Sequence, residues 1–161
     1  MKTTRAFTLI ELVIVIVLIG ILSATGSLLL RQTFKGYFTG ENITDLANKT
    51  NIATSNLMRE LKSAETISVI GANTLTFVNQ LGQTVVIDLS GTTLRRSVNG
   101  AGAQTLCTQV ISVAFAYVDQ AFATTAVANN VRFLTMQLAA STNDGLPYSL
   151  MAGTVLRKTL P

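Results

Sequence analysis

The sequence predicts an α+β fold in which one long N-terminal helix precedes an antiparallel β-sheet. Two observations carry this prediction. The 161-residue chain opens with an apolar run over residues 7–30 that contains a single charge, and helical periodicity continues to about residue 64. Residues 65–161 are then a series of short β-rich segments separated by turn residues. The length allows one domain plus an anchor, and too little chain remains for a second full domain.

The apolar run is long enough to cross a membrane as a helix. Residues 7–30 would span roughly 36 Å at about 1.5 Å per residue, against a hydrocarbon core of about 30 Å. Basic residues flank the run on both sides, so their distribution does not fix its orientation. Glycines at 20, 26, 36 and 40 predict either local unwinding, with a bend near residues 36–40, or close helix packing.

Glu11 is the one charge in this run. An acidic side chain costs roughly 2.5–3.5 kcal/mol at the membrane centre on insertion scales, so its presence needs a reason. A secretory signal peptide cut near residues 23–26, or a plain signal anchor, would explain the apolar run. Neither explains a carboxylate at position 11.

Residues 31–64 continue the helix with one apolar face. The members of that stripe recur at helical spacing and are Ile43, Leu46, Ala47, Thr50, Ala53, Leu57, Leu61 and Ala64. Polar and charged residues fall largely on the opposite side, so the stripe is expected to pack on a head domain. Packing is the default use of such a stripe and gives no evidence of a further function.

Strand patterns fill the rest of the chain. The predicted strands cover residues 66–70, 74–78, 84–89, 92–98, 106–119 and 130–140, with 148–157 as a last strand or an irregular tail. Ile111, Val113, Phe115 and Tyr117 are predicted to share one face, and Leu134, Met136 and Leu138 another. Residues 143–145 predict a turn.

The composition argues against enzyme chemistry. The chain has no histidine, which removes the commonest general base and metal ligand, and it has no phosphate-binding loop or zinc-ligand set. Cys107 is the one cysteine and is expected to be a small buried residue. Asn143 and Asp144 could offer oxygens to calcium, but a turn explains them better. No catalytic residue, metal site or cofactor is therefore predicted.

The charge does not favour nucleic acid. Twelve Lys and Arg against eight Asp and Glu give +4, and loss of Lys2 and Arg5 would leave +2. Arg95 and Arg96 could meet DNA or an acidic partner, but an exposed strand end explains them as well. The glycan-acceptor patterns at residues 42–44 and 48–50 lie in a predicted helix and are interpreted as chance matches.

The stretch Ala6-Phe7-Thr8-Leu9-Ile10-Glu11-Leu12 resembles the processing site of type IV prepilins and pseudopilins. The resemblance implies that a membrane peptidase cuts between Ala6 and Phe7, that Phe7 is then N-methylated, and that Glu11 pairs with the Phe7 amine of an adjacent subunit and sets axial register. Two departures are visible: the family prefers glycine where this chain has Ala6, and Leu28 stands near the position of a frequent proline.

The predicted head resembles that of larger minor pilins. The hairpin end at residues 91–96, GTTLRR, and the strand at residues 115–119, FAYVD, are similar to the J-type minor pseudopilin, the W-type minor pilin and the O-type protein of mannose-sensitive haemagglutinin pili. The resemblance implies the pilin fold, with a leader at 1–6, a membrane and filament-core helix at 7–30, its amphipathic continuation at 31–64 and a β head at 65–161.

The implied function is that of a minor pilin or pseudopilin that initiates or caps a type IV pilus-like filament. Its implied partners are other pilin or pseudopilin subunits, prepilin peptidase, an inner-membrane assembly platform and, before assembly, membrane lipid. The implied location is a single pass of the inner membrane with the head outside the cytoplasm, followed by the filament. A pseudopilus of type II secretion or DNA uptake is the alternative, and an anchored or secreted β-rich binding domain is a more distant one.

Overall fold

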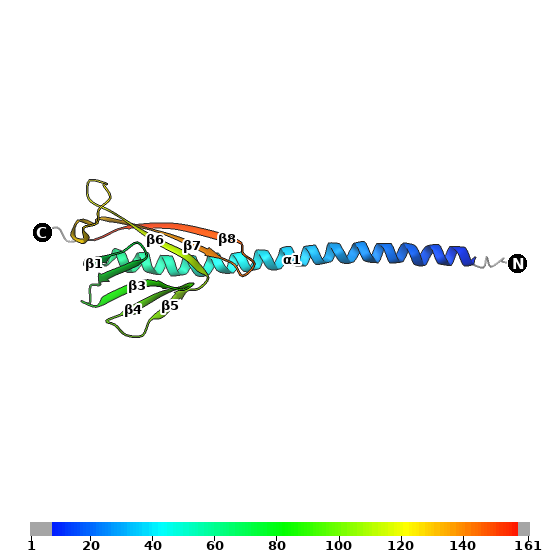
Figure 1. Cartoon of the computed structure of the whole chain (residues 1–161), viewed down its shortest axis with the longest axis horizontal. Helices are drawn as coiled ribbons and strands as arrows, with labels where there is room; N and C mark the ends of the chain where they lie inside the picture. Colours follow the sequence, from blue (N-terminus) through cyan, green and yellow to red (C-terminus); the bar gives the residue numbers. More distant parts are fainter. Residues whose placement is uncertain (1–7, 158–161) are drawn as a thin grey trace. The chain divides into compact units, whose positions relative to one another are not determined.

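A computed structural model describes residues 8–157 of the chain. The chain divides into two compact units, residues 1–41 and residues 42–161. Figure 1 labels the helix and strands. The second unit, which we call the head, contains all the strands and the last part of the helix.

Helix α1 covers Leu9–Lys62, 54 residues, and belongs to both units. Its end is closed locally, since the Ser63 hydroxyl donates to the Glu60 carbonyl at 2.8 Å and the Ala64 amide donates to the Leu61 carbonyl at 3.0 Å. The unwinding predicted around the glycines is wrong, because the helix is continuous through residues 20–40. One glycine lowers helix stability by only about 1 kcal/mol, which the surrounding helix formers tolerate.

The apolar stripe predicted for the second half of α1 is confirmed in the head. Its buried residues are Leu46, Thr50, Ala53, Thr54, Leu57 and Leu61. Their spacing of three and four residues places them on one side of the helix. The buried side chains fix the helix against the sheets, since each large apolar side chain stabilises the head by about 1.5–3 kcal/mol on burial.

The first sheet is an antiparallel meander. Its strands are β1 (Thr66–Ile70), β2 (Thr74–Val78), β3 (Thr84–Ser90), β4 (Thr93–Val98) and β5 (Gln104–Cys107), and they lie in that order. Tight turns with left-handed glycines at Gly82 and Gly91 connect β2 to β3 and β3 to β4. The hairpins predicted from the turn residues are therefore confirmed.

The second sheet has three antiparallel strands. They are β6 (Val110–Val118), β7 (Phe133–Ser141) and β8 (Pro147–Val155), in the order β6-β7-β8. A short 3-10 turn, η1 (Ala128–Asn130), precedes β7. The last segment is thus a regular strand of nine residues, and the predicted turn at residues 143–145 joins β7 to β8.

The single strand predicted over residues 106–119 is wrong. The structure divides it into β5 and β6, which belong to different sheets. Gln109 lies between them with φ 63°, a left-handed conformation that no glycine marks in the sequence. The pairing of β6 with β7 also shifts between Val110 and Ser112, so Ile111 is exposed while Val113, Phe115 and Tyr117 stay buried.

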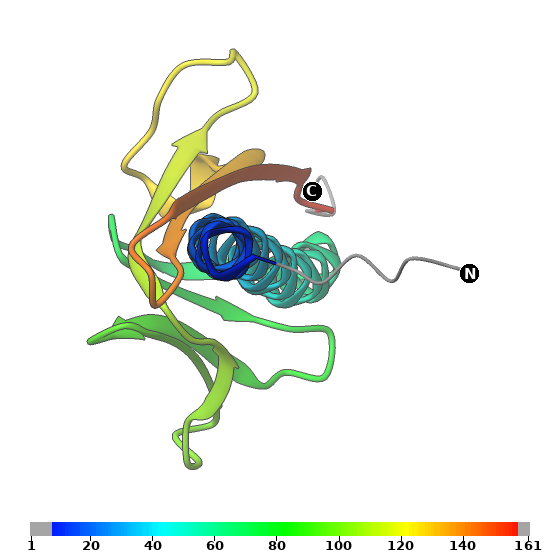
Figure 2. The same ribbon diagram turned by 90° about the vertical axis from the view of Figure 1, so that its right-hand side faces the viewer.

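The two sheets wrap around one side of the helix within the head, as Figure 2 shows. Backbone hydrogen bonds join them: the Phe115 amide donates to the Ala72 carbonyl at 3.0 Å, and the Val110 amide donates to the Thr92 carbonyl at 2.9 Å. Leu57, Leu61, Phe77, Leu134 and Met136 are among the side chains of one continuous core. The core therefore forms where the inner faces of both sheets pack against the buried face of the helix.

Tyr117 ties the second sheet to the β1–β2 turn. Its side chain is buried, and its hydroxyl donates to the Gly71 carbonyl at 3.0 Å. Burial raises the pKa of Tyr117 from 10.0 to about 12. Cys107 is buried as predicted, with its sulfur 3.6 Å from the Thr50 hydroxyl oxygen.

Candidate processing and assembly segment

The start of α1 is built from a reciprocal pair of side chains. Thr8 precedes the first helical residue, and its hydroxyl oxygen accepts a hydrogen bond from the Glu11 amide at 3.4 Å. The Glu11 carboxylate in turn accepts from the Thr8 amide at 3.4 Å and from its hydroxyl at 3.4 Å. This is a capping box, in which two residues satisfy helix N–H groups that have no partner within the helix.

Glu11 therefore has a local reason to be acidic. It lies in the first turn of α1, where the helix dipole favours negative charge. The pattern Thr-x-x-Glu before an apolar run is a capping-box signal. Thr8 is the functional residue that the sequence interpretation missed, although this signal was present in the letters TLIE.

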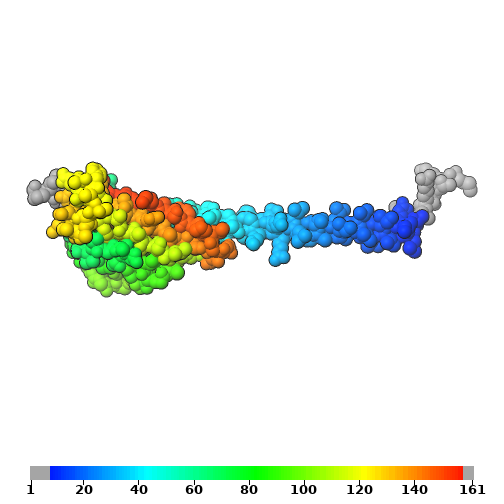
Figure 3. Space-filling model, turned by 45° about the horizontal axis from the view of Figure 1, so that its top comes forward, coloured from blue at the N-terminus to red at the C-terminus, as the bar shows by residue number. Residues whose placement is uncertain are grey.

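Within residues 8–157, the apolar part of α1 is an exposed helical surface. Its side chains from Leu9 to Leu30 are exposed, and Figure 3 shows them uncovered along residues 8–41, blue to cyan. By length and composition α1 is the one helix of the described chain that could cross a membrane. This surface fits a single-pass membrane anchor and, equally, a helix that packs against other helices.

Polar side chains inside this segment satisfy their hydrogen bonds on the helix itself. The Thr25 hydroxyl donates to the Ile21 and Leu22 carbonyls at 3.1 and 3.0 Å, and the Ser27 hydroxyl donates to the Ser23 carbonyl at 2.7 Å. Such bonds remove the cost of an unpaired hydroxyl in an apolar medium. The segment is thus compatible with lipid despite its Ser and Thr content.

The glycines of the segment leave open space. A Cβ atom added to Gly20, Gly26, Gly36 or Gly40 would meet no atom within 4 Å outside the neighbouring helix backbone. Packing within this chain therefore does not require them. Small residues on an uncovered helix allow another helix to approach closely, which is the second of the two roles expected for them.

Two predicted site residues lie outside the described part of the chain. Ala6 and Phe7, assigned to leader cleavage and N-methylation, precede residue 8. Glu11 is described and exposed, at the beginning of the helix. The structure therefore brings Glu11 together with Thr8, and the pairing of Glu11 with a Phe7 amine stays a prediction.

The other candidate sites are accounted for by contacts within the head. Asp144 accepts a hydrogen bond from the Asn42 amide at 3.0 Å, and Asn143 accepts one from the Gln109 amide at 2.7 Å. Arg95 pairs with Asp88 across β3 and β4, and Arg96 pairs with Glu60. Within residues 8–157, no three His, Cys, Asp or Glu side chains are grouped so that they could hold a metal ion.

The comparisons with known proteins bear on the N-terminus. The family described as the prokaryotic N-terminal methylation motif matches residues 1–27, which include Ala6, Phe7 and Glu11. The search of curated proteins found no match. The matched motif and the α+β layout together support a type IV pilin-like precursor, processed by prepilin peptidase and assembled with other pilin subunits.

Proposed function

We propose that this chain is a minor pilin or pseudopilin that initiates or caps a type IV pilus-like filament. The observation that carries the proposal is the methylation motif over residues 1–27, placed at the start of an apolar helix that the chain leaves uncovered. The proposed role is structural and not enzymatic. Prepilin peptidase cuts between Ala6 and Phe7, and Phe7 is then N-methylated.

The proposed mechanism makes Glu11 the counter-charge of a new N-terminus. Cleavage creates an α-amino group with a reference pKa near 8, which is positively charged at neutral pH. A charge that leaves water for an apolar medium needs a partner of opposite sign. The carboxylate of one subunit and the Phe7 amine of the next supply that pair and set the axial register of the helices.

The proposed assembly route begins in the inner membrane. The apolar half of α1 spans the lipid once, with the head outside the cytoplasm, and an assembly platform moves the subunit into a growing filament. Helix packing replaces lipid contacts at that step, and Gly20 and Gly26 admit neighbouring helices. A pseudopilus of type II secretion or DNA uptake uses the same steps and is the alternative system.

Replacement of Glu11 tests this proposal. We expect Glu11→Leu to enter the membrane normally, because it removes a charge from an apolar run, but to be incorporated poorly into filaments. The measurement compares the amount of subunit in sheared filaments with the amount in membranes. The matched control is Glu41→Leu, which removes an acid from the same helix outside the apolar run.

Three outcomes decide the test. Loss of incorporation in Glu11→Leu but not in Glu41→Leu supports the proposed pairing. Normal incorporation of Glu11→Leu would remove the role assigned to the carboxylate. Absence of the wild-type chain from any filament would instead favour the anchored β-rich binding domain.

A further inference from the structure

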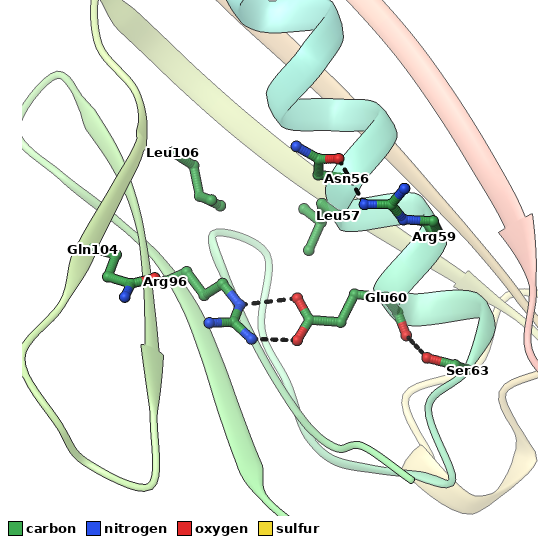
Figure 4. A pocket seen from close by; sticks show the side chains of 8 residues that line it. All are labelled: Asn56, Leu57, Arg59, Glu60, Ser63, Arg96, Gln104 and Leu106. Atoms are coloured by element: carbon green, nitrogen blue, oxygen red, sulfur yellow. Dashed lines mark hydrogen bonds and ion pairs between the residues drawn. The ribbon is translucent and has the colours of Figure 1, made fainter. Parts of the chain in front are cut away.

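The end of α1 in the head forms one side of a groove. A hollow of about 440 Å³ lies between the helix and strands β4 and β5, where Arg96, Gln104 and Leu106 face it. Figure 4 shows this hollow, with Arg59 and Glu60 on the helix and Arg96 opposite. A second hollow of about 290 Å³ is lined by Arg59, Lys62, Ser63, Gln80 and Arg157. The two hollows share Arg59 and Ser63, so they adjoin, and we call them together the basic groove.

One acid and one base of the groove neutralise each other. The Arg96 guanidinium donates two hydrogen bonds to the Glu60 carboxylate, at 2.9 and 2.5 Å. These bonds raise the pKa of Arg96. A paired arrangement of this kind is geometrically specific and uses both carboxylate oxygens. Glu60 is therefore engaged by Arg96 and forms no ion pair with another cation of the groove within residues 8–157.

Three cations of the groove remain without an acidic partner. Arg59, Lys62 and Arg157 are exposed, and none of them forms an ion pair with another residue in the range 8–157. Arg59 donates a hydrogen bond to the uncharged side chain of Asn56 at 3.0 Å. By contrast, the other lysine of α1 within the head, Lys49, pairs with Asp45 at 2.6 Å. The groove is thus a local excess of positive charge.

The form of the groove favours an extended ligand over a single small ion. Its three free cations are exposed: all of them line the second hollow, Arg59 borders both hollows, and they do not converge on one buried point. Asn56, Gln80 and Gln104 offer amide groups that suit a polypeptide backbone, and Leu57 and Leu106 add apolar contacts in the first hollow. An extended chain with one carboxylate every few residues matches this pattern.

Nucleic acid fits the groove less well. A typical duplex-binding protein makes about six to ten phosphate contacts. Within residues 8–157, the groove offers only three free cations, which are few for that purpose. Charge complementarity therefore selects an acidic polypeptide.

We propose that the basic groove binds an extended acidic segment of a partner polypeptide. Recognition would come from Arg59, Lys62 and Arg157 facing carboxylates of that segment. The inference does not depend on whether the chain enters a filament, because the groove lies wholly within the head.

The test uses the full chain in an uncharged detergent and a fluorescein-labelled octaglutamate peptide, followed by fluorescence anisotropy. We expect saturable binding that weakens when salt rises from about 50 to about 200 mM, because exposed charges are screened over that range. Lys62→Gln and Arg157→Gln should each weaken binding about fivefold, the effect of one charge pair about 4 Å apart in water. Lys49→Gln is the matched control, with the same charge change on the same helix, and should leave the affinity unchanged.

Two competitors separate the possible ligands. The labelled octaglutamate should be displaced by unlabelled octaglutamate at a lower concentration than by an oligothymidylate of eight nucleotides or by inorganic phosphate. Tighter binding of the oligothymidylate would mean that the ligand of the groove is nucleic acid and not an acidic polypeptide. Equal competition by phosphate would mean that the groove is a site for small anions. Absence of octaglutamate binding, or an equal loss in Lys49→Gln, would overturn the proposal. The substituted side chains are exposed, and circular dichroism of each variant verifies the fold.

Discussion

Tyr117 shows how one buried polar side chain links the two sheets of the head. Its hydroxyl donates to the carbonyl of Gly71 at 3.0 Å, while the ring belongs to the core. A net contribution of about 1 kcal/mol is typical of such a bond, and removal of the hydroxyl would also leave a carbonyl without this donor. The residue therefore contributes both packing and a specific position for the β1–β2 turn.

The raised pKa of Tyr117 predicts sensitivity of the head to alkali. Because the folded-state pKa is about 12 and the ordinary value is 10.0, the unfolded chain loses the phenol proton first as the pH rises. This contribution to the free energy of unfolding is complete below about pH 10 and is lost between about pH 10 and 12. We expect Tyr117→Phe to be about 1 kcal/mol less stable at neutral pH and to decline less steeply above pH 10. Both effects are measured by unfolding the head in guanidinium and monitoring the unfolding through hydrogen exchange of its strands.

Tyr148→Phe provides the control for this prediction. Tyr148 is half-buried on β8, and its hydroxyl makes no hydrogen bond within residues 8–157. Its removal should leave the alkaline decline as in the wild type. Identical pH profiles for Tyr117→Phe and the wild type would contradict the role assigned to the buried phenol.

Helix α1 depends at its first turn on the capping box of Thr8 and Glu11. Loss of a Thr cap costs about 1 kcal/mol in typical helices. We expect Thr8→Val to increase hydrogen exchange of the amides at residues 9–12, while Thr8→Ser, which keeps the hydroxyl, should exchange like the wild type. The measurement is hydrogen exchange with mass spectrometry of the full chain in detergent. Unchanged protection in Thr8→Val would mean that the cap does not hold the first turn.

The elements that periodicity predicts best are those whose boundaries carry a chemical signal. The stripe from Leu46 to Leu61 and the hairpins at Gly82 and Gly91 follow directly from helical spacing and left-handed glycines. The division of residues 106–119 could not be predicted, because Gln109 adopts φ 63° without a glycine. The bulge beside Ile111 turns the Ile111 side chain to the exposed face of the sheet, although the residue types around it still favour a strand.

The candidate site was predictable to different degrees. Glu11 was evident because a charge in an apolar run is costly, whereas its partner Thr8 was marked only by the capping-box spacing of Thr and Glu in the letters TLIE. The basic groove could not be predicted from spacing, since Arg157 lies far along the sequence from Arg59 and Lys62 and meets them only in the fold. Arg95 and Arg96 were conspicuous in the sequence, yet both are ion-paired within the head.

At the scale of the whole molecule, the two units present different surfaces. The head encloses a core to which both sheets and α1 contribute, whereas the apolar side chains of α1 in residues 9–30 are exposed. Exposed apolar area of this extent requires lipid or protein cover. The proposed pilin precursor, which exchanges a membrane for a bundle of like helices, meets this requirement in both states.

The mass of the mature chain tests this account most directly. The full chain is produced with an active prepilin peptidase, purified from membranes and measured intact and after digestion, with a peptidase-inactive strain as the control. We predict a chain that begins at N-methylated Phe7 in the first case and one that keeps residues 1–6 in the second. A chain that begins near residue 25, or that keeps Met1 beside an active peptidase, would contradict the account.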